Sequence, residues 1–254
     1  MILVVDIGNS NIVLGGVEEE QILFEARLRT DPTKTSDEYC IDLKMILEVY
    51  GVKASDVEGS IIASVVPQVL NSMQTALKKL TGKTALVVGP GLKTGLNIKV
   101  ENPSQTGADL VVGCVAALRE HKPPLIVIDM GTATTITVVD KDKNYCGGMI
   151  LPGLRVSLDS LTSRTSQLPR ISLDPPKRLI GKNTNDCMKS GILYSTAYGI
   201  DGFIENIEKE LGEKVTIIAT GGLAKEIVAC CEKDIIFNKD LVLQGLLIIY
   251  KKNR

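Results

Sequence analysis

The chain has 254 residues, of which 44% are hydrophobic and 23% charged, and its formal net charge is −1. This composition is typical of a globular protein with one large or two modest domains, and it lacks the basic stripe of a nucleic-acid-binding surface. No stretch approaches the roughly 20 apolar residues of a membrane span, and the short apolar start has no basic leader. We therefore expect a cytoplasmic protein with no nucleic-acid or membrane partner.

The six cysteines show no CxxC spacing, and His121 is the only histidine. Because zinc sites and disulfide frameworks have characteristic cysteine and histidine spacings, we expect free thiols in a reducing compartment instead. His121 lies in the polar segment "EHKPP", where a histidine seldom has a catalytic role. A Ser-His-Asp triad therefore has little support.

The first half of the chain predicts three short strands, then alternating helices and strands. Pro67 suits the first turn of a helix, and "GSIIASVV" has the continuous apolar character of a buried strand. The expected elements are strands at 2–6, 12–17 and 21–29, a helix from Ser36 to about Tyr50, a strand at 59–66, a helix from Pro67, a strand at 84–89 and a helix over 104–120.

The second half repeats this order. Three strands with tight turns precede a helical region that is broken by "LPRISLDPP", and strand and helix patterns then alternate to the end. The expected elements are strands in "LIVIDM", "TTITVVD" and "NYCGGMIL", a helix from about Thr184 to Leu211, a strand in "VTIIAT", a helix after "GGLA", a short strand in "DIIF" and a closing helix in "DLVLQGLLIIYKK". This long repeat predicts a duplicated domain rather than a solenoid.

Each half contains an acidic turn of the form Asp-x-Gly, at Asp6 and at Asp129. Hairpins favour Asp, Gly and Asn for purely local reasons, so one copy alone would favour a structural explanation. Two copies at matching places in the two halves favour a functional explanation over a structural one. Backbone N–H groups of such turns bind phosphate oxygens, and a carboxylate at a strand end can hold a hydrated Mg²⁺.

Motifs along the whole chain carry a family resemblance: "VVDIGNSN", "ASVVPQV", "VGPGLKTGLNIK", "ENPSQTGAD", "VIDMGTATT", "GGMILPG", "LPRISL", "IGKNTNDCMKSGI", "ATGGLA" and "DLVLQGLLIIY". They resemble the type III pantothenate kinase family, within the acetate kinase, sugar kinase, Hsp70 and actin superfamily. The resemblance implies an α/β fold of duplicated ribonuclease H-like (actin-like ATPase) domains with an interdomain cleft, which we divide at 1–115 and 116–254. It also implies ATP-dependent phosphorylation of pantothenate, the first step towards coenzyme A, with Mg²⁺, a monovalent cation (K⁺ or NH₄⁺) and a homodimer.

The nucleotide site is expected at the two acidic turns. The resemblance implies that Thr132 contacts the nucleotide and that Asp129 helps bind the monovalent cation, while Asp6 would hold Mg²⁺ through water. Gly221 and Gly222 could let a nucleotide approach the backbone, or could form a plain strand-to-helix turn. The expected nucleotide-binding residues of the first turn are Asp6, Ile7, Gly8, Asn9, Ser10, Asn11, Ile12 and Val13.

Asp109, in "QTGADL", is the expected catalytic base, since a carboxylate near the substrate hydroxyl can accept its proton during phosphoryl transfer. Thr106 and Asp109 also have the spacing of a helix capping box, and this spacing alone favours the cap. The family motif Gly-x-Asp shifts the balance to catalysis. The two roles are compatible, because a helix N-terminus favours an anionic carboxylate.

The substrate pocket shows two departures from the family. Leu110 stands where the family usually has Arg, and Val100 where it often has Tyr, so either another cation binds pantothenate, or binding is weak, or the acceptor differs. Arg155, Arg164 and Lys182 are candidate replacements. Thr184 matches a pantothenate contact, with a helix N-cap as its alternative role. The expected substrate-binding residues are Val100, Gly107, Ala108, Asp109, Leu110 and Thr184.

Two other functions stay open. A kinase of the same fold could act on another small hydroxyl compound, and a nucleotide-binding regulator could have lost phosphoryl transfer. The presence of Asp6, Asp109, Asp129 and Thr184 argues against the regulator, because such a protein needs no catalytic base.

Overall fold

The computed structural model describes residues 1–254, and its contacts group them into two compact units. The first unit comprises residues 1–96, 101–119 and 240–254, and the second comprises residues 97–100 and 120–239. These units differ from the expected halves 1–115 and 116–254 chiefly in the closing helix, which belongs to the first unit. No helix is both long enough and apolar enough to cross a membrane.

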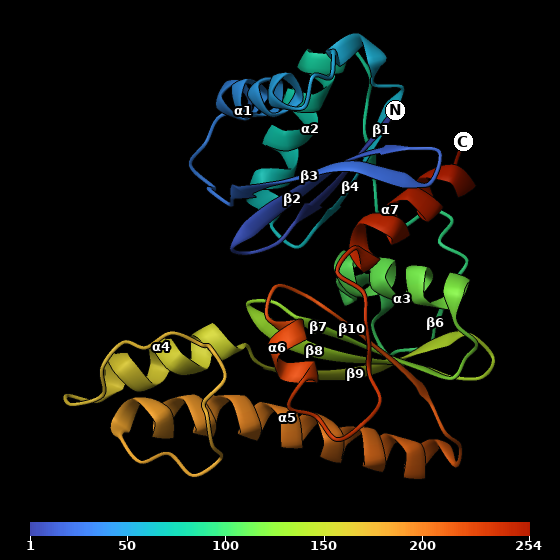
Figure 1. Ribbon diagram of the computed structural model, residues 1–254. Helices are drawn as coiled ribbons and strands as arrows, with labels where there is room; N and C mark the ends of the chain where they lie inside the picture. The colour runs from blue at the N-terminus through green and yellow to red at the C-terminus, as the bar shows by residue number, and fades with distance from the viewer. The chain divides into compact units, whose positions relative to one another are not determined.

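The first unit is built on a five-stranded sheet with the order β3-β2-β1-β4-β5 (Figure 1). Strand β1 pairs antiparallel with β2 and parallel with β4, and β2 pairs antiparallel with β3. Its elements are β1 (Ile2–Ile7), β2 (Asn11–Glu18), β3 (Gln21–Arg29), α1 (Ser36–Val49), the 3₁₀ turn η1 (Ala54–Asp56), β4 (Gly59–Ser64), α2 (Pro67–Thr81), β5 (Leu86–Val87), the 3₁₀ turn η2 (Pro103–Gln105), α3 (Ala108–Glu120) and α7 (Leu241–Lys252).

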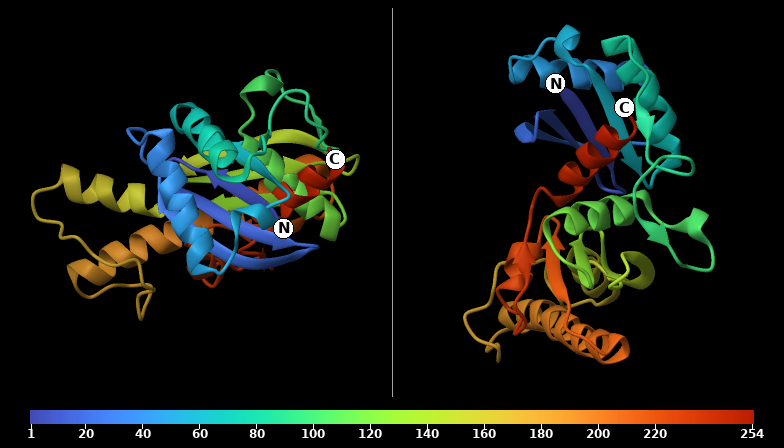
Figure 2. Two further views of the ribbon diagram at one scale, coloured as in Figure 1. Left: turned by 90° about the horizontal axis from the view of Figure 1, so that it is seen from above. Right: turned by 90° about the vertical axis from the view of Figure 1, so that its right-hand side faces the viewer.

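Helices cover both faces of this sheet. Helices α1 and α2 form a core with one set of alternating strand residues, including Leu3, Val5 and Ile7. Helix α7 lies against β1 and β4 on the other face, and the right-hand view of Figure 2 shows it beside these strands. Gly15 permits this approach, because a Cβ there would lie 3.1 Å from the Leu243 side chain. This packing explains why the closing helix joins the first unit.

Local signals set the ends of α1 and α2 as expected. Thr35 caps α1, and Glu38 completes a reciprocal capping box with it, so the helix begins at Ser36. Pro67 is the first residue of α2, and Gly82 ends that helix in the left-handed conformation. Both predicted helices are therefore confirmed, together with the strands that flank them.

The second unit is built on a six-stranded sheet with the order β11-β10-β7-β8-β9-β6. Strands β7, β8 and β9 pair antiparallel, and β7 pairs parallel with β10, so the order of β1 to β4 is repeated. The expected α/β class and duplication are confirmed. The elements are β6 (Asn97–Ile98), β7 (Leu125–Met130), β8 (Ala133–Val139), β9 (Asn144–Pro152), α4 (Leu154–Arg164), α5 (Thr184–Leu211), β10 (Thr216–Thr220), α6 (Ala224–Val228) and β11 (Ile236–Phe237).

Helices α4, α5 and α6 share a core with one face of this sheet. Ile128, Met130 and Ile136 contribute from the strands, and Ile192 and Ile200 contribute from α5. Helix α5 spans the predicted residues 184–211. Figure 1 shows α5 running along the sheet with α4 beside its N-terminal part.

Two features of the fold differ from the sequence-based expectation. Strand β6 was not expected, since two residues carry no readable periodicity; it pairs parallel with β9, and Asn97 Nδ2 donates to Asn144 Oδ1 at 2.6 Å. The expected helix over 104–120 begins only at Ala108, because η2 precedes it.

Candidate functional site

The first acidic turn joins β1 to β2. The Gly8 N–H donates to the Asn11 carbonyl at 3.0 Å and closes the hairpin. Asp6 is half-buried near the end of β1, whereas the side chains of Asn9, Ser10 and Asn11 are exposed. The turn therefore presents polar side chains and backbone to solvent, next to one carboxylate.

The apolar residues that flank this turn cannot contact a nucleotide through buried side chains. Ile7 and Ile12 are buried in the core beneath α1 and α2, and Val13 is half-buried. The two isoleucines can offer a ligand only their backbone atoms. Their side chains instead anchor the turn to the sheet.

Thr30, which sequence reasoning missed, fixes this turn from the end of β3. Its hydroxyl donates to the Gly8 carbonyl at 2.6 Å, and its backbone N–H donates to the Ser10 carbonyl at 3.1 Å. Thr30 is only 8% exposed. A single threonine after a strand is an ordinary sequence feature, so no signal identified it; the contact arises from the pairing of β2 with β3.

The second acidic turn joins β7 to β8 and packs tightly against two glycines. The Gly131 N–H donates to the Ala133 carbonyl at 3.0 Å, and the Gly153 N–H donates to the Thr132 carbonyl at 3.1 Å. Gly221 has φ +106°, and a Cβ there would lie 2.5 Å from the Met130 carbonyl oxygen. Gly221 thus has a packing reason for being glycine, whether or not a nucleotide approaches it.

The two aspartates occupy equivalent places in their sheets. Both lie on the face opposite the core that the long helices form, because Ile7 and Met130, their neighbours in sequence, point into those cores. Asp6 lies between Val13 and Ala63 in the strand register. Asp129 has different neighbours in its sheet.

Asp129 lies between two threonines, Thr135 of β8 and Thr220 of β10. Directly opposite residues in a sheet project from the same face, so hydroxyl groups flank this carboxylate. The Thr135 Oγ1 atom is buried and has no hydrogen-bond partner within the protein. Buried hydroxyl groups usually have a hydrogen-bond partner, so a cation that binds oxygen atoms fits this position.

Asp109 lies in the first turn of α3 and is half-buried. Its Oδ1 accepts the Leu110 N–H at 2.8 Å, and burial raises the pKa of its carboxyl above the usual value. A Cβ at Gly107 would lie 2.5 Å from this Oδ1, so the glycine leaves room for the carboxylate. The capping-box alternative is wrong, because Thr106 ends η2 and α3 begins at Ala108.

The remaining substrate residues are divided between the units. Gly107, Ala108 and Leu110 lie with Asp109 in the first unit, whereas Val100 and Thr184 lie in the second. Thr184 is exposed at the first position of α5, and its alternative role as N-cap is wrong, because Asn183 caps the helix by accepting the Asp186 N–H at 2.9 Å. The Thr184 hydroxyl is therefore not used in capping.

The structure contains no group of three or more His, Cys, Asp or Glu residues arranged to hold a metal ion. Mg²⁺ in phosphate-binding sites keeps several waters and needs only one or two carboxylates besides the phosphates. The single half-buried carboxylate of Asp6, beside the exposed first turn, fits this kind of binding.

Comparison with known sequences identifies related proteins over the whole chain. The model of the type III pantothenate kinase family matches residues 2–206. A type III pantothenate kinase of Halalkalibacterium halodurans is 42% identical over 253 residues, covering 100% of both chains. Another, of Bacillus cytotoxicus, is 42% identical and covers 100% of this chain and 97% of its own.

Solved structures with low sequence identity share the fold. Component A of the (R)-2-hydroxyglutaryl-CoA dehydratase of Acidaminococcus fermentans has a TM-score of 0.57 at 15% identity, covering 98% of this chain and 96% of its own. A Sinorhizobium meliloti protein assigned as a 2-dehydro-3-deoxygalactonokinase has a TM-score of 0.61 at 14% identity, covering 99% and 96%. The fold is therefore that of the actin-like ATPases and sugar kinases, with duplicated ribonuclease H-like domains.

Proposed function

We propose that this chain, which belongs to the type III pantothenate kinase family, transfers the γ-phosphoryl group of ATP to the primary hydroxyl of pantothenate. The product is 4'-phosphopantothenate, and the reaction is the first step of coenzyme A synthesis. The observation that carries this proposal is the full-length match to named relatives, together with two acidic turns in repeated units.

The first turn would hold the phosphate chain of ATP. Phosphoryl transfer needs mainly positioning and charge stabilisation, which the exposed donors between Gly8 and Asn11 can supply. Bound Mg²⁺ would neutralise phosphate charge, and Asp6 would orient its water ligands. Thr30 would keep the turn in one conformation, since it holds the Gly8 and Ser10 carbonyls.

Asp109 would accept the proton of the acceptor hydroxyl. Because burial raises the pKa of its carboxyl, the carboxylate is a stronger base than an ordinary aspartate. The hydrogen bond from the Leu110 N–H to Oδ1 leaves Oδ2 available for the substrate.

Asp129 and Thr135 would hold the monovalent cation. Oxygen atoms coordinate K⁺ and accept hydrogen bonds from NH₄⁺, and these residues offer a carboxylate and a buried hydroxyl that lacks a protein partner. Thr132, in the same turn, would contact the nucleotide. The dependence of turnover on K⁺, with Na⁺ as the control ion, tests this assignment.

The acceptor pocket lacks the usual arginine at Leu110, so another cation would bind the pantothenate carboxylate. Arg155 and Arg164 of α4, together with Arg170, line one cavity of about 1100 Å³ in the second unit. No ion pair involves these three arginines. This cavity contains none of the expected substrate residues, so Arg155 and Arg164 stay candidates together with Lys182.

An altered acceptor is the second candidate function, and the apolar Leu110 is the observation that favours it. Loss of a charge-assisted contact costs about 1.5–3 kcal/mol, or roughly ten- to a hundredfold in binding. A kinase with the same ATP site but a different small hydroxyl substrate would show ATP binding without pantothenate turnover.

ADP release tests the function directly. The protein would be mixed with ATP, Mg²⁺ and K⁺, with and without pantothenate, and ADP would be followed by a coupled assay. We expect release that depends on pantothenate. ATP binding without such release would contradict the proposed acceptor, and a screen of other hydroxylated acids would follow. Sedimentation analysis would test the homodimer that the family predicts.

A further inference from the structure

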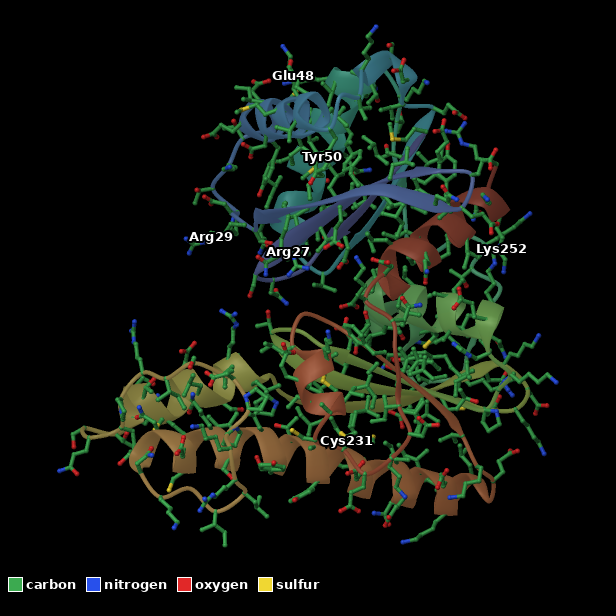
Figure 3. All side chains as sticks on the ribbon, in the orientation of Figure 1. Arg27, Arg29, Glu48, Tyr50, Cys231 and Lys252 are labelled. Carbon is green, nitrogen blue, oxygen red and sulfur yellow. The ribbon has the colours of Figure 1, made fainter.

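The end of β3 places an arginine beside the first acidic turn. In the register of β2 with β3, Arg29 lies directly opposite Asn11, and Arg27 lies opposite Val13. Both arginines are exposed, and Figure 3 shows them at the end of β3 that leads to α1. Neither residue belongs to a motif that the sequence analysis singled out, because β3 reads as an ordinary amphipathic strand.

Strand register puts this arginine on the same face as Asp6. Asp6 lies opposite Val13 in β1 and β2, and Asn11 is two residues from Val13 in the same strand. Directly opposite residues, and residues two apart in one strand, project from the same face of a sheet. Asp6, Asn11 and Arg29 therefore point to one side, away from the core beneath α1 and α2.

The backbone at Arg29 is held firmly to the turn. Thr30, the next residue, makes the two hydrogen bonds to the Gly8 and Ser10 carbonyls described above. The segment that follows is fixed as well, since the Tyr39 hydroxyl donates to the Asp31 carbonyl at 2.8 Å. The Cα of Arg29 is therefore fixed relative to the turn, and the backbone needs no rearrangement for this side chain to reach a ligand held there.

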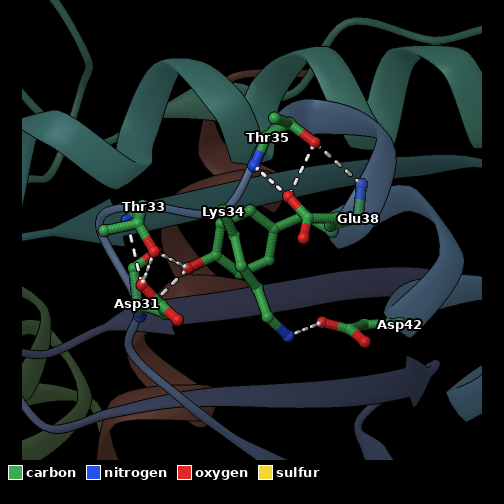
Figure 4. Close-up of polar contacts among 7 residues, drawn as sticks. Asp31, Thr33, Lys34, Thr35, Glu38 and Asp42 are labelled. Carbon is green, nitrogen blue, oxygen red and sulfur yellow. Dashed lines mark hydrogen bonds and ion pairs between the residues drawn. The ribbon is translucent and has the colours of Figure 1, made fainter.

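Arg29 forms no salt bridge within the protein. The Asp31 carboxylate is near enough for the charge of Arg29 to contribute to its lowered pKa, but hydrogen bonds from Thr33 are the larger cause, and Oδ1 accepts the Thr33 N–H at 2.9 Å and the Thr33 hydroxyl at 2.6 Å. Lys34 pairs with Asp42 at 2.7 Å instead, as Figure 4 shows. Arg27 lies 3.5 Å from Glu25, whereas Arg29 forms no salt bridge.

We propose that Arg29 binds the phosphate chain of the nucleotide held by the first turn. This inference rests on the proposed function, because it assumes that ATP binds at this turn. The planar guanidinium offers several donors in a fixed geometry that matches phosphate oxygens, and it stays charged at every relevant pH. Asn11 and the turn backbone would contact the same phosphates from the neighbouring strand.

Nucleotide binding by calorimetry tests this assignment. ATP, ADP and adenosine would be titrated with Mg²⁺ into wild type, Arg29→Gln and Arg29→Lys. We expect Arg29→Gln to raise the Kd for ATP about ten- to a hundredfold and to leave adenosine binding unchanged. Arg29→Lys would recover part of the loss, since it keeps the charge but not the paired donors.

Arg119→Gln is the matched control. Arg119 is also an exposed arginine of the first unit, but it pairs with Glu20 at 2.6 Å in the turn at the opposite end of β2 and β3. The substitution Arg119→Gln changes the net charge by the same amount as Arg29→Gln, and we expect this variant to keep the wild-type Kd for ATP. An equal loss in Arg119→Gln would overturn the assignment, because general electrostatics would then explain the effect.

Two further outcomes separate the inference from the proposed function. If wild type binds ATP and Arg29→Gln binds it with the same Kd, the role of Arg29 is overturned but the proposed function is not. A wild-type protein that binds no ATP would overturn the proposed function and this assignment together. Thermal unfolding of each variant would establish that the exposed substitutions leave the fold intact.

Discussion

Asp6 lies between Val13 and Ala63 in its sheet, whereas Asp129 lies between Thr135 and Thr220. The hairpins that follow are alike, since a glycine N–H closes each one at 3.0 Å. What differs is the pair of residues in register with the carboxylate, which are apolar at Asp6 and carry hydroxyl groups at Asp129. The same turn can therefore serve different ligands in the two units.

The supports of the two turns differ as well. Thr30 and the end of β3 hold the first turn through hydrogen bonds and leave its side chains exposed. Close backbone packing at Gly153 and Gly221, together with the hydrogen bond from the Gly153 N–H to the Thr132 carbonyl, holds the second turn. We interpret the first turn as the place for phosphates and Mg²⁺, and the second as the place for a cation coordinated by protein oxygens.

The largest effect is expected at a residue that belongs to neither turn. Asp109→Asn should lower kcat by about 10²–10⁴-fold, because the general base is lost, while the Kd for ATP stays unchanged. In wild type, kcat should fall as the pH drops through a pKa above the usual aspartate value, since burial raises it. Turnover and calorimetry measure both quantities.

The same substitution should stabilise the fold at neutral pH. A carboxyl with a raised folded-state pKa binds its proton more tightly when folded, so stability falls as the pH rises from the unfolded pKa through the folded one. The neutral amide avoids this loss. An Asp109→Asn variant with full activity and unchanged stability would contradict the assignment of the base.

Asp6→Asn tests the first turn. We expect turnover to fall about 10²–10³-fold and the requirement for Mg²⁺ to rise, because the group that orients the hydrated ion loses its charge. The K⁺ dependence of the remaining activity should stay as in wild type. A variant that loses its K⁺ response but keeps its Mg²⁺ response would reverse the roles given to the two turns.

Asp129→Asn is the matched change in the second turn. Loss of one charged ligand should raise the K⁺ concentration for half-maximal turnover about tenfold, the equivalent of one charge-assisted contact. The Mg²⁺ requirement should stay unchanged. Titration of each ion at saturating levels of the other separates the two turns. Unaltered K⁺ activation would contradict a cation at Asp129.

The smallest effects are expected at two adjacent threonines. The Oγ1 atoms of Thr134 and Thr135 are both buried and without a partner. Thr134 faces the helix-covered core, since it lies opposite Met130, and Thr135 faces the side of Asp129. Thr134→Val should stabilise the fold by about 1 kcal/mol and leave K⁺ activation unchanged.

Thr135→Val serves as the contrast to this variant. It should also stabilise the fold in the absence of K⁺, but it should raise the K⁺ requirement, because a ligand oxygen is removed. Denaturant unfolding and K⁺ titration measure the two effects. Identical K⁺ curves for both valine variants would show that Thr135 takes no part in cation binding.

Much of the fold could be predicted from local signals. Pro67 at the start of α2, the repeated strand order and the limits of α5 at Thr184 and Leu211 all follow from periodicity and helix-end chemistry. These signals are local, so they do not depend on where distant segments pack. The turns at Asp6 and Asp129 were also identified, because each carries its residues in one short stretch.

Features that depend on distant pairing were not predicted. Strand β6 exists through its pairing with β9, and Thr30 and Arg29 reach the first turn through the register of β2 with β3. The closing helix reads as part of the second half but packs on the first sheet. The alternative N-cap of α5 at Thr184 was misplaced by one residue, because the cap is Asn183.

Phosphorus NMR of the complete reaction tests the central claim most directly. ATP, Mg²⁺, K⁺ and pantothenate would be incubated with the protein, and all phosphorus species would be followed together. We predict that a new phosphomonoester appears in equal amount with ADP, and that Asp109→Asn forms neither. ADP accompanied only by inorganic phosphate, or no change in ATP, would contradict a pantothenate kinase.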